Sequence, residues 1–134
     1  MTRMMQATAL TNQCATSPLV GVVGICAVGK STLTNGLRSA GYSVIEIPQE
    51  HSELPYLWAR HHPAFLVYLD VADAVVEKRR SYLVRERLAQ ERELLAFARA
   101  NAQLRLDVDG MDPKQVLEAV VAALEAAGIT RNPF

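Results

Sequence analysis

The sequence predicts an α/β fold in which a mainly parallel sheet of about four strands is flanked by helices on both sides. Two observations carry this prediction. Apolar runs that suit strands alternate along the chain with longer segments of helical periodicity, which is the pattern of parallel strands joined by helical crossovers. The runs LVGVV and AFLVYL are apolar without alternation, as expected for strands that are buried on both faces.

Length and composition fit one domain. The 134 residues lie in the range of ~100–200 residues per domain, and we expect residues 1–17 to form a flexible leader and residues 18–134 the domain. Fourteen basic residues balance fourteen acidic ones, so no overall field favours a nucleic acid or an anionic membrane as partner. No run reaches the ~18 apolar residues of a membrane span, and two cysteines are too few for a disulfide scaffold. We therefore expect a cytoplasmic protein.

The first half of the chain predicts three strands and one helix. We expect the strands over Leu19–Val23, Tyr42–Ile47 and Ala64–Asp70. The helix is expected over Gly29–Ala40, with Gly41 as its stop signal. Residues 49–63 lack periodicity and predict a loop with one short helical turn around Tyr56–Arg60.

The second half predicts two helices around a short strand. A charged helix is expected over Ala72–Ala100 with a break near Arg80–Tyr82, and a strand over Leu104–Val108. The last helix has a clear start signal, with Asp112 as N-cap, Pro113 at the first helical position and Gln115 three residues after the cap. Its predicted buried face contains Val116, Val120 and Leu124, and Gly128 ends it.

Residues 24–31 read GICAVGKS and match the phosphate-binding pattern G-x-x-x-x-G-K-[ST], or Walker A. Gly24 and Gly29 allow backbone conformations that turn N–H groups towards a phosphate. Lys30 reaches the β- and γ-phosphates, Ser31 offers a hydroxyl to Mg²⁺, and the following helix directs its positive end at the anion. The buried strand before the motif and the helix after it are the context that it requires.

We therefore predict a three-layer P-loop NTPase that binds ATP, or another nucleoside triphosphate, with Mg²⁺. The predicted nucleotide-binding residues in the loop are Gly24, Ala27, Val28, Gly29, Lys30, Ser31 and Thr32. No N-K-x-D motif occurs, which argues against a GTPase switch. Without bound phosphate, we expect the Lys30 ammonium to be solvated and to have no obligatory partner.

Phosphoryl transfer needs a carboxylate near Mg²⁺ and often a base for the attacking hydroxyl. Asp70 ends one predicted strand and Glu50 follows another, and ligands of open α/β sheets gather at the carboxyl ends of strands. The sequence favours both equally as catalytic and metal-binding carboxylates. The alternatives are a solvated loop position for Glu50 and a helix cap for Asp70. His51 is more simply a polar loop residue than a base.

Three segments together resemble the P-loop nucleoside and nucleotide kinases, and thymidylate kinases in particular. They are LVGVVGICAVGKSTLTNGL, FLVYLDV with an arginine pair after it, and RLDVDG before a helix. The resemblance covers residues 19 to about 125 and implies phosphoryl transfer from the nucleotide to a small-molecule acceptor. It implies lid arginines at Arg79, Arg80, Arg85 and Arg87, with Arg85 and Arg87 as the catalytic ones, and a loop near the base formed by Asp109, Gly110 and Met111.

The chain departs from that family in the interval before the third strand. Only about 35 residues separate Lys30 from Ala64, so a βα unit and much of the expected acceptor site are missing. We then expect the second strand to lie next to the first, with Glu50 beside the metal. An exposed sheet edge left by the missing unit would be covered by homodimerisation.

The alternative function is a nucleotide-binding module, or a slow NTPase whose acceptor is water. A pocket between residues 48–63 and the arginine run would favour the kinase. A pocket closed by Tyr56 and Trp58 would favour the module. The run KRRSYLVRER is also typical of an ordinary helix face with ion pairs.

Overall fold

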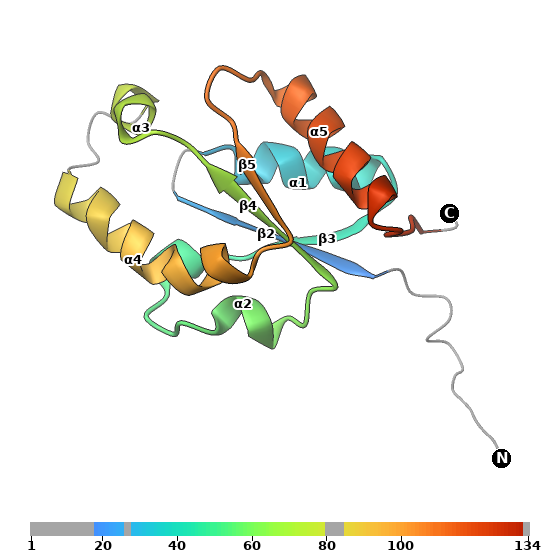
Figure 1. The fold of residues 1–134 in the computed structure, drawn as a ribbon, viewed down its shortest axis with the longest axis horizontal. Helices are drawn as coiled ribbons and strands as arrows, with labels where there is room; N and C mark the ends of the chain where they lie inside the picture. The colour runs from blue at the N-terminus through green and yellow to red at the C-terminus, as the bar shows by residue number, and fades with distance from the viewer. Residues whose placement is uncertain (1–17, 26–27, 80–84, 133–134) are drawn as a thin grey trace, which may run out of the picture.

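A computed structural model describes residues 18–25, 28–79 and 85–132. Four parallel strands form one open sheet in the order β3-β2-β4-β5 (Figure 1). Their bounds are β2 Leu19–Gly24, β3 Ser43–Glu46, β4 Phe65–Asp70 and β5 Leu104–Asp107. The predicted α/β class and the parallel sheet are confirmed, and each strand lies within a residue or two of its predicted position.

Helices lie on both faces of the sheet. The helix α1, Lys30–Ser39, and the helix α5, Pro113–Ala126, cover one face, and α4, Arg85–Asn101, and α2, Leu57–Arg60, lie on the other (Figure 1). The remaining elements are the 3₁₀ turn η2, Gln49–His51, and the helix α3, Asp73–Arg79. The predicted leader and the predicted break at Arg80–Tyr82 fall outside the described residues. Among the helices that are described, none has the length and apolar character needed to cross a membrane.

The strand order places the central strand β2 at a reversal of direction in the chain path. From β2 the chain passes through α1 to β3 on one side, and it then returns past β2 to β4 on the other side. Val22 of β2 is paired in register with Glu46 of β3 and with Val67 of β4. The carboxyl end of β2 is therefore a topological switch point, which is where open α/β sheets bind ligands.

The core lies on both faces of β2 and β4. Residues 65–69 of β4 are buried throughout, because apolar helix faces pack on either side of the strand. Leu37 of α1 packs from one side and Leu95 of α4 from the other, and both are fully buried. In α5, Val120 and Leu124 are buried as predicted. Full burial of such side chains contributes about 1.5–3 kcal/mol each.

The start of α5 is fixed by a capping box, as the sequence predicts. The Asp112 side chain accepts a hydrogen bond from the backbone N–H of Gln115 at 2.8 Å, and the Gln115 side chain accepts one from the N–H of Asp112 at 2.9 Å. Asp112→Ala is expected to lower the free energy of unfolding by about 1 kcal/mol, measured by urea denaturation. Asp112→Asn should retain most of it. Equal stabilities for the alanine variant and the wild type would contradict the cap.

Candidate functional site

The ammonium of Lys30, the first residue of α1, is buried at the carboxyl end of β2. Its Nζ donates hydrogen bonds to the carbonyl oxygens of Gly24 at 2.7 Å and Ile25 at 3.1 Å, and to Glu50 Oε2 at 2.7 Å. The Lys30 side chain is 6% exposed and that of Glu50 is 4% exposed. The expectation of a solvated Lys30 is therefore wrong. The protein itself supplies three acceptors, of which one is a carboxylate twenty residues further along the chain.

Glu50 reaches Lys30 because β3 lies directly beside β2, as the short connection predicts. It belongs to η2, which follows β3, and the preceding residue anchors this turn. Gln49 is fully buried. Its side-chain amide donates to the carbonyl of Leu54 at 2.8 Å and accepts from the N–H of Trp58 at 2.9 Å. These two bonds fix the path of the loop next to Glu50, whose carboxylate contacts Lys30.

One carboxylate oxygen of Glu50 has no partner among the residues that the structure describes. Within the part of the chain that the structure describes, Glu50 Oε1 is buried and makes no hydrogen bond. His51 Nε2 lies 3.6 Å from the other oxygen, Oε2. A buried carboxylate oxygen left unpaired has a considerable desolvation cost, which a ligand with a hydrogen-bond donor or a cation would offset.

A second carboxylate, which the sequence reasoning missed, lies at the end of β3. Ser31 Oγ donates a hydrogen bond to Glu46 Oε1 at 2.8 Å. The serine of the Walker A pattern thus has an acidic neighbour. The signal was available in the sequence, since Glu46 is an acidic residue near the end of a predicted strand, but only the strand order shows that this strand lies next to β2 and the segment that follows it.

The start of α1 has a left-handed residue before it and no described side-chain cap. Gly29 precedes the helix with φ 101°, a left-handed conformation that favours glycine. No described side chain caps the first turn of α1, so its first N–H groups remain available to a ligand. Val28, Gly29, Ser31 and Thr32 lie in this region as predicted, whereas Ala27 and Cys26 fall outside the described residues.

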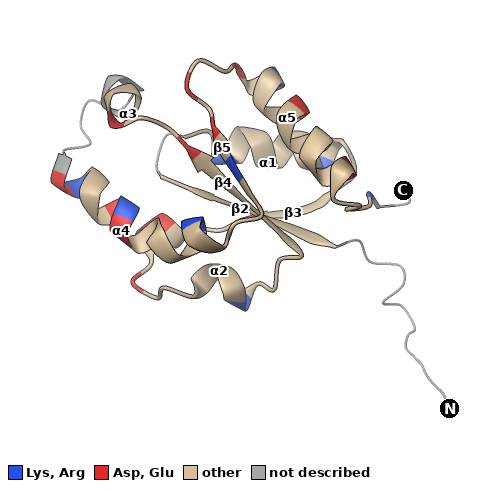
Figure 2. Cartoon of the chain, viewed as in Figure 1, with Lys and Arg blue, Asp and Glu red and all other residues tan. Residues whose placement is uncertain are grey.

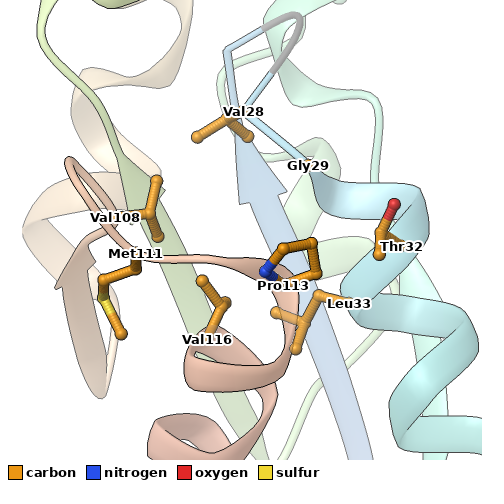
Figure 3. A pocket seen from close by; sticks show the side chains of 8 residues that line it. All are labelled: Val28, Gly29, Thr32, Leu33, Val108, Met111, Pro113 and Val116. Atoms are coloured by element: carbon orange, nitrogen blue, oxygen red, sulfur yellow. The ribbon is translucent and has the colours of Figure 1, made fainter.

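An apolar pocket of about 170 Å³ adjoins this helix start, between α1 and α5. We call it the α1–α5 pocket. In Figure 3, Thr32 and Leu33 of α1 face Pro113 and Val116 of α5 across it. Met111, in the loop after β5, also lines it. Gly110 has φ 76° in the same loop, while the Asp109 side chain instead accepts a hydrogen bond from the N–H of Ala72. Of the three residues that the resemblance placed near a base, Met111 is therefore the one that lines this pocket, together with Val28 and Gly29.

A second pocket, of about 240 Å³, lies between η2 and α4. We call it the η2–α4 pocket. On α4 it is lined by Arg87, Gln90, Glu91 and Leu94, whose spacing places them on one face of the helix. Glu50 lines the opposite wall, together with His51 and Glu53. This pocket lies between the predicted loop and the arginine run, where the kinase interpretation places the acceptor.

Asp70, the other predicted carboxylate, lies at the end of β4 and contacts arginines. Arg92 and Arg99 of α4 each lie 3.4 Å from one of its oxygens, and the N–H of Val71 donates to it at 3.0 Å. Charges of both signs alternate along α4 (Figure 2). Asp70 thus belongs to an ion-pair cluster, and no described contact joins it to Lys30 or Ser31.

Two groups in this cluster have shifted pKa values. Burial raises the pKa of Tyr68 above its usual value, and the nearby Asp70 carboxylate raises it further. Burial alone would lower the pKa of Arg92, but its hydrogen bond and its charge interaction with Asp73 raise the pKa overall. Both shifts are consistent with a structural role for the cluster.

Tyr56 and Trp58, at the start of α2, pack on α4 rather than into the η2–α4 pocket. Tyr56 meets Phe97 edge-on at 4.9 Å between ring centroids, and Trp58 lies 5.7 Å from the same ring. Neither Tyr56 nor Trp58 lines the η2–α4 pocket. Of the predicted lid arginines, Arg87 has its Nε 3.6 Å from Glu91. Arg80 falls outside the described residues, and the side chains of Arg79 and Arg85 are not described.

No protein-family model matches the chain, and no curated protein is significantly similar to it in sequence. The function is therefore inferred from the site alone.

Proposed function

We propose that the protein is a P-loop NTPase-fold phosphotransferase that binds a nucleoside triphosphate with Mg²⁺ and transfers its γ-phosphoryl group to a small-molecule acceptor. The observation that carries this proposal is the meeting of Lys30 and Glu50 at the carboxyl end of β2. A cation for phosphate and a carboxylate for the acceptor hydroxyl are thereby brought to one point. ATP is the expected donor, with GTP as the other option.

The residues present fit both the phosphates and the metal. Lys30 would bind the β- and γ-phosphates by exchanging its hydrogen bonds to the carbonyls of Gly24 and Ile25 for phosphate oxygens, and the N–H groups at the start of α1 would add to this binding. Ser31 and Glu46 offer two oxygen ligands of the kind Mg²⁺ prefers. When bound, Mg²⁺ supplies charge neutralisation on the phosphate oxygens. The α1–α5 pocket, with its apolar lining, would take the base beside Met111.

Glu50 is proposed as the base rather than as a metal ligand. The acceptor oxygen forms a bond to the γ-phosphorus while the bond from that phosphorus to the β,γ-bridging oxygen breaks, and the nucleoside diphosphate leaves. The acceptor hydroxyl proton passes to the Glu50 carboxylate, which lines the pocket. Lys30 holds one oxygen of this carboxylate and thereby fixes its orientation.

The η2–α4 pocket favours a transferase over a nucleotide-binding module. It begins at Glu50, which is in contact with Lys30, and it is not closed by Tyr56 or Trp58. An acceptor seated there would lie beside the proposed base. A slow NTPase with water as acceptor would have no need of this pocket.

Thermal unfolding with nucleotides tests the proposal. ATP with Mg²⁺ at ~100 times its dissociation constant should add about 2.7 kcal/mol of stability, and thus raise the Tm by several degrees. AMP, which lacks the phosphates that Lys30 would bind, should give a much smaller rise, and removal of Mg²⁺ should reduce the ATP effect. Equal shifts with ATP and AMP, or none with any triphosphate, would contradict the proposal.

A further inference from the structure

The η2–α4 pocket has an acidic lining. It contains three carboxylates, those of Glu50, Glu53 and Glu91, against the single arginine Arg87. Glu50 and Glu91 are 4% and 1% exposed. Two buried carboxylates on facing walls are unusual, because acidic side chains are almost never fully buried unless they are paired.

Two cations each contact one of these carboxylates. Arg87 Nε lies 3.6 Å from Glu91, and Lys30 is hydrogen-bonded to Glu50. Counted over its lining residues, the pocket still carries more carboxylates than cations, so an occupant meets an excess of negative charge. A phosphomonoester carries about −1.5 to −2 charges at pH 7 and would be repelled there.

The size of the pocket limits the occupant. Its volume of about 240 Å³ is below the ~300 Å³ at which pockets for drug-sized ligands begin. Leu94 supplies an apolar surface, and the Gln90 amide can donate as well as accept a hydrogen bond. A molecule of about the size of a monosaccharide, with several hydrogen-bond donors, matches this lining.

We propose that the η2–α4 pocket selects an uncharged or cationic compound of this size that donates hydrogen bonds to the carboxylates of its lining, and that it excludes phosphorylated acceptors. As a statement about the phosphoryl acceptor, this inference rests on the proposed function. The acceptor inferred here differs from the nucleotide acceptor of a thymidylate kinase. To bind such a phosphorylated acceptor, the pocket would need cations that are not paired with its own carboxylates.

The test uses three matched probes, glucosamine, glucose and glucose 6-phosphate, titrated into ¹⁵N-labelled protein. Glucosamine should shift the backbone amide signals of His51, Gln90 and Leu94. Glucose should shift the same signals but bind more weakly. The affinity of glucose 6-phosphate should be lower than that of glucosamine by at least about tenfold. Equal or tighter binding of glucose 6-phosphate would overturn the inference, and so would the absence of a shift at these residues with all three probes.

A charge reversal at an exposed position provides the matched control without risk to the fold. Glu53→Lys should weaken the binding of glucosamine and strengthen the binding of glucose 6-phosphate. Glu118→Lys on the exposed side of α5 should change neither affinity. Equal effects of both variants would refute the local charge argument. Failure of the proposed function is seen separately, because ATP with Mg²⁺ is expected to shift Thr32 and Leu33. If ATP with Mg²⁺ does not shift these two signals, nucleotide binding is refuted, whereas the inferred preference of the pocket is unaffected.

Discussion

Lys30→Met is expected to destabilise the ligand-free protein strongly and to abolish its stabilisation by nucleotide. The substitution keeps the apolar stem of the side chain but leaves Glu50 buried without its cation. Removal of one partner of a buried ion pair costs about 3–5 kcal/mol. Urea denaturation measures this loss, and thermal unfolding with ATP and Mg²⁺ measures the loss of the ligand-induced shift.

The double variant Lys30→Met/Glu50→Gln separates the two effects. It should recover part of the lost stability, because no uncompensated carboxylate remains. It should still show no nucleotide-induced shift, because the phosphate-binding cation is gone. If Lys30→Met alone is as stable as the wild type, the ion pair between Lys30 and Glu50 does not form in solution. A full ATP-induced shift in either variant would refute the phosphate-binding role of Lys30.

Gly24→Ala is expected to be the second most damaging substitution. A Cβ at this position would lie 2.8 Å from Val28 Cγ1 and 2.9 Å from the carbonyl oxygen of Leu69, which is backbone of β4. Since Gly24 is paired with Leu69 in the sheet, the end of the β2–β4 ladder must open. Overpacking of this kind costs about 1–3 kcal/mol, measured as the free energy of unfolding in urea.

Comparison of Gly29→Ala with Gly24→Ala separates the cost of backbone strain from the cost of insufficient space. A Cβ at Gly29 would meet no atom within 4 Å, but φ is 101°, so the cost is the strain of about 1–2 kcal/mol for a left-handed residue with a side chain. Gly29→Asn should lose less, because asparagine tolerates this conformation better. No such rescue is expected for Gly24→Asn. If both glycines respond alike to alanine and asparagine, the two mechanisms are not distinct.

Local sequence signals predicted most of the fold correctly. Continuous apolar runs identified β2 and β4, and the Asp112 capping box located the start of α5 to the residue. Such signals depend on residues within a few positions of one another. The order of strands in a sheet does not depend on neighbouring residues in this way. For that reason the sequence favours Glu50 and Asp70 equally as the carboxylate at the site. The placement of β3 beside β2 brought Glu50 to Lys30 and left Asp70 among the arginines of α4.

The two errors at the site have the same origin. Glu46 was missed, and Lys30 was expected to be solvated, because each has its partner on the other side of a crossover. Ser31 and Glu46 are fifteen residues apart, and Lys30 and Glu50 are twenty apart. Motif spacing describes what a phosphate loop offers to a ligand. It carries no information on which carboxylates of the same chain satisfy the loop when the ligand is absent.

The buried amide of Gln49 has a mechanical consequence. Residues 47–64 cross from one edge of the sheet to the far side of β2 without forming a strand, and the Gln49 side chain ties this segment down at the backbone of Leu54 and Trp58. These two bonds couple the position of residues 54–58 to that of the turn that carries Glu50. Gln49→Leu, which would leave an apolar side chain in the core but remove both bonds, is therefore a change whose effect should extend beyond the loop to the Lys30–Glu50 contact.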